Sequence, residues 1–388
     1  MAPAPTASQA LAGFLLSGFL FALLGAVLPA WGYHRDPPEF VTIGNCFLCL
    51  AVGVIAAQLL SARILAWKGL RFLLVFACLL GCAGLVSLAL ATPPVGWPWR
   101  MPGLAALGLA VGLLNAGLFQ AVAACYTREP VRVAATGGIF YGLGCLAATL
   151  LVAGTFYAYS VPVILLLMAL APAIFAAVYA RTPVAAQAPL AQTPLRQVLR
   201  DFRSPGAVLF ALLLFFQFGN EWSIAGWLPL FLVRRLGISP PASLGLLSIY
   251  WAALLVGRIV AVAILPKVRH SRLLGASVLS ALFGCMLLAL TNNRFGAGAG
   301  VVLAGAGFAS VYPLVAGRIG GRFPYFHPVF FGGIFSFALF GGLIAPATLG
   351  YAASAWGIGI VMALPLIGTC MVFCLLVLIW LESKLAGN

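Results

Sequence analysis

Residues 207–232 read AVLFALLLFFQFGNEWSIAGWLPLFL. The stretch is long and apolar enough to cross a bilayer as one helix, which requires about 20 mainly apolar residues. One acid, Glu221, interrupts it near the middle. A charged side chain at that depth costs about 2.5–3.5 kcal/mol on insertion scales. The stretch therefore predicts a membrane helix that retains a carboxylate at a cost, which points to a functional role.

Composition extends this prediction to the whole chain. Hydrophobic residues make up 64% of its 388 positions and charged residues 7%, whereas about a quarter of an ordinary soluble domain is charged. The 21 basic and 6 acidic residues are too few to cover a soluble surface. The basic residues are scattered between apolar runs, so the net charge of +15 does not indicate a nucleic-acid partner. We expect an all-α membrane protein.

Other apolar runs of similar length predict further membrane helices, to a total of twelve. The first run lacks a basic leader and a cleavage site, so we expect a retained span and not a signal peptide. The predicted spans lie near residues 11–31, 40–61, 70–91, 102–124, 133–155, 161–180, 207–232, 243–265, 273–291, 296–317, 328–351 and 358–381.

The basic residues favour one orientation of these spans. With both termini in the cytoplasm, 16 of the 21 basic residues face the cytoplasm, in line with the positive-inside rule. The remaining 5 are Arg35, Arg100, Arg234, Arg235 and Arg294. We therefore expect a multi-pass protein of the plasma (cell inner) membrane with cytoplasmic termini.

A polar linker divides the predicted spans six and six. Residues 181–205 are rich in proline, alanine and glutamine, and then in arginine. The halves also echo each other, because Gly-Gly-Ile-Phe occurs at 137–140 and again at 332–335, in predicted spans five and eleven. This pattern favours two six-helix bundles, residues 1–180 and 206–388, around a central cavity.

Motifs for catalysis or for cofactors do not stand out. Cys46 and Cys49 have CxxC spacing, but they lie in an apolar run without histidines or a second cysteine pair nearby. No phosphate-binding loop of the form GxxxxGK(S/T) occurs, which argues against direct drive by ATP. We expect neither an enzyme nor a bound cofactor or metal.

The loop after the second span carries a family resemblance. Residues 61–71, SARILAWKGLR, resemble the G-x-L-a-D-r-x-G-r-R/K signature of the major facilitator superfamily, with Gly69 and Arg71 in place and Ala66 where the aspartate usually falls. The resemblance implies twelve helices in two six-helix bundles that work by alternating access. The missing aspartate puts the charge relay of that loop in doubt.

Later motifs resemble the fucose permease-like branch of this superfamily, whose members carry hexoses. They are Gly219-Asn220-Glu221 with Trp227, Gly257-Arg258, Gly305-Ala306-Gly307 with Tyr312-Pro313, and Gly341-Gly342 with Pro346 and Gly350. The resemblance implies sugar transport. The proton-coupled fucose transporter places acids in spans one and four, and residues 11–31 and 102–124 contain none, so coupling by that particular mechanism is not supported.

Helical spacing around Glu221 predicts the substrate site. Gln217 and Glu221 fall on one stripe of the helix, and Asn220 and Trp227 fall on the next, with Trp222 beside them. We expect these residues to face the central cavity and to bind substrate or accept a proton. The alternative is a carboxyl that pairs with another helix and holds the bundle together.

Further candidates lie in other spans. Asn115 and Gln120 are the main polar side chains of predicted span four, and each either lines the cavity or bonds to another helix. Amphipathic aromatic residues at suitable depth complete the candidate substrate site: Tyr141, Tyr250 and Tyr312. Arg258 and Arg71 are candidates for gating, although a snorkelling arginine at the end of predicted span eight also explains Arg258.

Together these features predict a secondary active or facilitative transporter for a small polar solute, in first place a monosaccharide. Two alternatives remain: an exporter of hydrophobic or cationic compounds, and a non-transporting membrane receptor or scaffold. The expected partners are the solute, protons or another coupling ion, and membrane lipids. We expect a monomer.

Overall fold

The computed structural model describes residues 5–128, 130–181, 203–265, 267–322 and 328–385. The predicted linker lies largely outside these residues. Within them, the regular elements are helices: α1 (Pro5–Val27), α2 (Phe40–Leu90), the 3-10 helix η1 (Trp97–Arg100), α3 (Met101–Arg128), α4 (Pro130–Thr155), α5 (Val161–Arg181), α7 (Pro205–Leu236), α8 (Pro240–Ile264), α9 (His270–Leu290), α10 (Arg294–Ala309), α11 (Val311–Arg322), α12 (Pro328–Trp356) and α13 (Ile360–Leu385).

Ten helices in the described part of the chain are long and apolar enough to cross a membrane. The longest, α2, has 51 residues and breaks at Gly69, whose φ of 79° is a left-handed conformation that favours glycine. Gly53 and Gly84, on either side of the break, pack against Ala105 and Gly103 of α3, so both arms of α2 run along the same segment of α3. The arms correspond to predicted spans two and three. The chain is a multi-pass membrane protein.

Two other helices differ from simple single spans. The apolar part of α1 that is described, Leu11–Val27, is shorter than the others. The run predicted near 296–317 is divided between α10 and α11, with a break at Ser310. Such a break frees backbone carbonyls at the end of α10.

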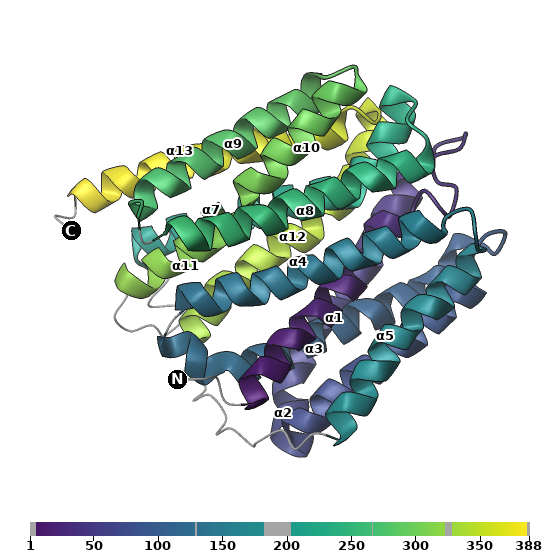
Figure 1. Ribbon diagram of the computed structural model, residues 1–388, viewed down its shortest axis with the longest axis horizontal. Helices are drawn as coiled ribbons and strands as arrows, with labels where there is room; N and C mark the ends of the chain where they lie inside the picture. Colours follow the sequence, from purple (N-terminus) through teal and green to yellow (C-terminus); the bar gives the residue numbers. More distant parts are fainter. Residues whose placement is uncertain (1–4, 129, 182–202, 266, 323–327, 386–388) are drawn as a thin grey trace.

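The helices gather in two sets that meet along four main helix pairs. In Figure 1, α1–α5 (purple to teal) lie on one side and α7–α13 (teal to yellow) on the other. We call them the first and second helix sets. The main contacts between the sets run along α1 with α7, α2 with α12, α4 with α8, and α4 with α11. These contacts leave room for a site between the sets.

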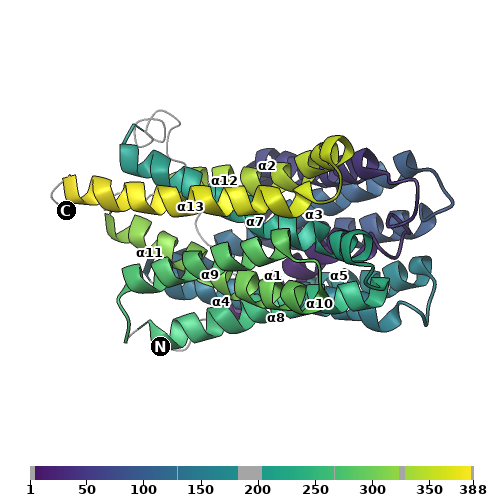
Figure 2. The same ribbon diagram turned by 90° about the horizontal axis from the view of Figure 1, so that it is seen from above.

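The two ends of the molecule are defined by loops. Figures 1 and 2 show that α1 begins and α13 ends at the same end. Near this end Gly13 lies against Tyr179 of α5, and Arg71, just after the turn of α2, donates a hydrogen bond to Ala180 O. We call it the Gly69 end. The opposite end carries the loop between α1 and α2, and we call it the Asp36 end.

Glycines set the distance between α1 and α4. A Cβ on Gly18 would collide with the carbonyl of Tyr141, and a Cβ on Gly144 would collide with the carbonyl of Leu15. Small residues let membrane helices approach closely and pack backbone against backbone. This contact fixes the wall of the first helix set that carries Tyr141.

Replacement of Gly144 tests the contact. We expect Gly144→Val to destabilise the protein by about 1–3 kcal/mol, the usual range for overpacking a close contact. The midpoint of thermal unfolding in detergent measures the effect. Gly154→Val is the matched control, because Gly154 lies in the same helix and a Cβ added there would meet nothing within 4 Å. Equal midpoints for both variants would contradict this account of the packing.

Candidate functional site

A cavity of about 120 Å³ lies between the two helix sets. Residues of α1, α2, α3 and α4 line it from one set, and residues of α7, α8, α11 and α12 line it from the other. Most lining side chains are aliphatic or aromatic. The polar or amphipathic ones are Asn115, Tyr141, Glu221, Trp222, Arg258 and Tyr312. Five of these six were predicted from the sequence as substrate-site residues, and Arg258 was predicted as a gating residue.

The centre of the site is an ion pair between α7 and α8. Arg258 Nη2 lies 3.5 Å from Glu221 Oε1, and the two side chains are only 9% and 4% exposed. Helix α8 therefore does not carry Arg258 out to a membrane surface by snorkelling. The pair neutralises the carboxylate of Glu221 and so offsets part of the cost of burying it.

Arg258 also connects the two helix sets. Its Nη1 donates to Gly138 O of α4 at 2.5 Å, and its Nε donates to Ala309 O at 3.4 Å. Ala309 ends α10, so the break before α11 supplies this acceptor. One guanidinium thus binds a carboxylate, a carbonyl of its own set and a carbonyl of the opposite set, which suits its fixed fork of donors.

One oxygen of the Glu221 carboxylate remains available as a hydrogen-bond acceptor. Its second oxygen, Oε2, is buried and has no hydrogen-bond partner among the described residues. Tyr250 donates to the backbone carbonyl of Glu221 at 3.2 Å and so positions this turn of α7. A buried carboxylate oxygen without a donor is costly. It is suited to accept a hydrogen bond from a hydroxyl of a bound solute.

The first helix set contributes one amide and an aromatic wall. Asn115 Oδ1 accepts a hydrogen bond from Ser17 of α1 at 2.7 Å. The ring of Trp222 meets Phe21 edge-on at 4.2 Å and Tyr141 edge-on at 5.8 Å. Ser17 and Phe21 were not among the predicted residues, since a serine and a phenylalanine in an apolar run give no signal of their own.

Other predicted residues lie in helix contacts. Asn220 donates to Thr369 of α13 at 3.3 Å, and Trp227 donates to Pro346 O of α12 at 2.9 Å. Gln217 donates to Phe308 O at 3.5 Å. Gln120 is buried in α3 and is not a lining residue of the cavity. Their contact with substrate stays a prediction, because none of these four residues lines the cavity.

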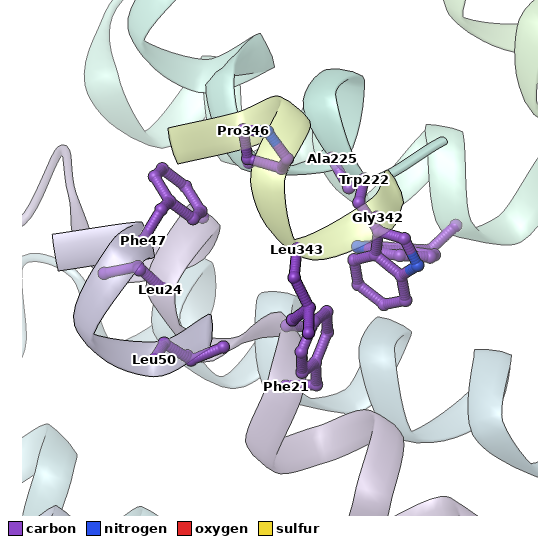
Figure 3. A pocket seen from close by; sticks show the side chains of 13 residues that line it. Phe21, Leu24, Phe47, Leu50, Trp222, Ala225, Gly342, Leu343 and Pro346 are labelled. Atoms are coloured by element: carbon purple, nitrogen blue, oxygen red, sulfur yellow. The ribbon is translucent and has the colours of Figure 1, made fainter. Parts of the chain in front are cut away.

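The cavity is separated from the Asp36 end by an apolar plug. We define the plug as Phe21, Leu24, Phe47, Trp222 and Leu343. It surrounds a space of about 20 Å³, which is room for about one water molecule. Figure 3 shows Phe21, Leu343 and Trp222 on one side of this space and Leu24 and Phe47 on the other. Phe21 and Trp222 line both spaces and together form the partition between them.

Close backbone contacts reinforce the plug. A Cβ on Gly25 would lie 2.5 Å from Ala225 O, and one on Gly44 would lie 2.7 Å from Ala347 O. These glycines join α1 to α7 and α2 to α12. The two helix sets therefore meet closely on the Asp36 side of Trp222.

Arg234 closes the same end at the surface. Its Nη2 lies 2.8 Å from Asp36 Oδ1, and its Nη1 donates to His34 O and Arg35 O at 3.1 and 3.2 Å. Arg234 belongs to α7, and its acceptors belong to the loop after α1, so these bonds join the two helix sets. We call them the Arg234 latch. Burial, together with the charges of Arg35 and Arg234, lowers the pKa of His34, so this imidazole is neutral near pH 7.

Comparison with known proteins places the fold. No protein-family model and no curated protein matches the chain. Several solved structures match it. A D-xylose-proton symporter has a TM-score of 0.75 at 15% identity, with 96% of each chain covered. The nucleoside transporter NupG has a TM-score of 0.72 at 14% identity, covering 98% of this chain and 100% of that chain.

The E. coli fucose:proton symporter FucP matches with a TM-score of 0.63 at 14% identity, covering 96% of this chain and 98% of that chain. The chain has the major facilitator fold. The resemblance seen in residues 61–71 is thus confirmed at the level of the fold. Within this fold, the cavity and the plug lie between the two helix sets, and the ion pair of the second set lines the cavity.

A double-variant cycle tests the ion pair. We expect Arg258→Met alone to lower the free energy of unfolding by about 3–5 kcal/mol, because it leaves Glu221 buried and unpaired. Adding Glu221→Gln should recover part of this loss. Unfolding in mixed detergent micelles, followed by tryptophan fluorescence, measures both. Arg272→Met, at an exposed arginine of α9, is the control. Strictly additive losses would show that the pair does not interact.

Removal of the Arg234 latch tests the closure of the Asp36 end. In a background without native cysteines, we expect Leu24→Cys to react several-fold faster with a water-soluble maleimide when Arg234→Gln is added. The control is Arg235→Gln, because Arg235 bonds to Asn292 within the second helix set. Equal rates in both variants would show that the latch does not hold this end closed.

Proposed function

We propose that the protein is a transporter that moves a small polar solute, in first place a monosaccharide, by alternating access. In this proposal twelve spans form two six-helix bundles, residues 1–180 and 206–388, joined by residues 181–205. The protein works as a monomer in the plasma (cell inner) membrane with both termini in the cytoplasm. The named functions of the structural neighbours, transport of xylose, nucleosides and fucose, support this class of solute.

One observation carries the proposal: the only intramembrane acid predicted from the sequence lies in the wall of a cavity between the two helix sets. Around it stand an amide from the opposite set, Asn115, and two amphipathic rings, Tyr141 and Trp222. Sugar hydroxyls bind carboxylate and amide groups, and the apolar face of a sugar stacks on aromatic rings. The site offers both kinds of contact.

The asymmetry of the cavity supports alternating access. The plug and the Arg234 latch close one side of it, and both consist of contacts between the two helix sets. Rocking of one set against the other would separate these contacts and expose the same central residues to the Asp36 end. A non-transporting receptor or scaffold has no need for contacts between the sets that close one side of a central site.

Glu221 is our candidate for coupling to protons. Proton symporters are among the structural neighbours. Glu221 is the only acid within the twelve predicted spans, so it is the carboxylate able to take up a proton in the centre. Protonation would remove its charge and release Nη2 of Arg258, whose Nη1 links α8 to α4.

Export of hydrophobic compounds is the second candidate, and one observation favours it. Four phenylalanines line the cavity: Phe14, Phe21, Phe119 and Phe218. A cationic substrate would bind less strongly than a neutral one, because Arg258 already neutralises the charge of Glu221. The site thus fits a neutral solute better than a cation.

Uptake into proteoliposomes tests the proposal. We expect accumulation of a labelled hexose or pentose, and faster accumulation with a pH gradient than without one. Glu221→Gln should lower uptake about 10- to 100-fold, the range for losing a hydrogen bond to a charged group. Glu39→Gln, at an exposed acid of the loop before α2, is the control. No uptake of any sugar, with unchanged ligand binding in Glu221→Gln, would reject the proposed function.

A further inference from the structure

The central cavity has a polar level and an apolar level along its axis. Asn115 of α3 is followed one turn later by Phe119 and then by Val122, all three on the cavity wall. At 1.5 Å per residue, Asn115 and Val122 are separated by roughly 10 Å along the helix. The polarity of the wall therefore changes over the length of a small molecule.

Contacts between helices fix the polar level. Ser17 of α1 bonds to Asn115, and Gly18 lies against the backbone of Tyr141. Gly138, one turn before Tyr141, accepts the bond from Arg258, which pairs with Glu221. The Asn115 amide, the Glu221 carboxylate and the Arg258 guanidinium thus lie at one height along the cavity axis, within one or two helical turns.

The apolar level follows toward the Gly69 end. Phe14 lies one turn before Ser17, meets Phe119 edge-on at 5.2 Å, and would touch a Cβ on Gly137 at 3.5 Å. Val122 and Val133 continue the same wall. We define the apolar chamber as Phe14, Phe119, Val122 and Val133. These four side chains of the first helix set present no polar group to a ligand, and on the opposite wall Phe218 packs against Tyr312, whose hydroxyl is the one polar group among these six lining side chains.

A free hexose does not match this division. Its hydroxyls point in all directions, so those turned toward the apolar chamber would lose water without gaining a hydrogen bond. A solute with a hydroxylated ring at one end and a flat apolar group at the other matches both levels. The hydroxylated ring would reach Glu221 Oε2, and the flat group would lie against Phe14 and Phe119.

We propose that the solute of this site is a sugar joined to an aromatic ring, the chemistry shared by aryl glycosides and nucleosides. The inference rests on the proposed function and narrows its substrate class. Burial of the aromatic group should tighten binding about 10- to 100-fold over the same sugar without it. The gain should depend on the apolar chamber and not on the ion pair.

Isothermal titration of the purified full-length protein in nanodiscs tests the proposal. The probes are phenyl β-glucoside against methyl β-glucoside, and uridine against ribose, so the two pairs separate the two sources of the aromatic ring. We expect at least one aromatic member to bind about 10- to 100-fold more tightly than its partner. Phe119→Ala should reduce that ratio below about threefold.

Two further variants serve as controls for this measurement. Phe119→Leu keeps most of the volume in case Phe119→Ala fails to fold, and it should reduce the ratio in part. Phe283→Ala, at a phenylalanine of α9 that is 55% exposed, should leave the ratio unchanged. Each variant is checked by its thermal unfolding midpoint.

The outcomes separate this inference from the proposed function. If ribose and methyl glucoside bind as tightly as their aromatic partners, sugar recognition stands and the aromatic requirement is rejected. If the ratio survives in both Phe119 variants, the apolar chamber is not the site of the ring. If none of the four probes binds, the proposed function fails and this inference fails with it.

Discussion

Everything at the centre of this protein depends on the need to keep a buried carboxylate from standing alone. Glu221 lies in a low-dielectric interior, where an unpaired charge is strongly unfavourable. Arg258 supplies the opposite charge and, with its two remaining donor groups, reaches Ala309 O and Gly138 O. The constraint on one acid thereby fixes the relative positions of α7, α8, the end of α10 and α4. The arginine that pairs with this costly buried charge therefore also links the two helix sets.

The glycine contacts explain why the free space lies where it does. On the Asp36 side of Trp222, Gly25 and Gly44 bring backbones together, so the gap between the sets closes. At the level of Arg258, Gly138 and Gly142 leave a long side chain room against α4, and the sets stay apart by the width of the cavity. The helix sets are in backbone contact at one level and in side-chain contact at the next, so the cavity between them is closed toward the Asp36 end. Trp222 lies where the distance between the sets changes, and its ring fills the space there.

The sequence alone predicted the parts of this arrangement that depend on local composition. Apolar run length found the helices, including both arms of α2, and the single acid in residues 207–232 found Glu221. The partner of Glu221 was not predicted, because the pairing with Arg258 depends on how α7 and α8 pack, and no spacing within either helix encodes it. The same reason explains Asn220 and Trp227: a helical wheel shows that they share a face, but only tertiary structure shows that α12 and α13 cover that face. The break at Ser310 lies in a continuous apolar run and leaves no mark on hydropathy.

The contacts that would separate in alternating access are unequal. The pair of Arg234 and Asp36 is largely solvent-exposed on the acid's side, at 85%, and such surface pairs contribute about 1 kcal/mol or less. The plug loses only dispersion contacts when it opens, since it contains no ion pair. The bond of Arg258 to Gly138 O is partly buried and charge-assisted, so it is the stronger link between the sets. Opening at the Asp36 end therefore leaves the central link intact, and the sets would pivot about Arg258. In the proposed transport cycle, protonation of Glu221 or binding of a solute to it would act directly on that pivot, through the guanidinium of Arg258.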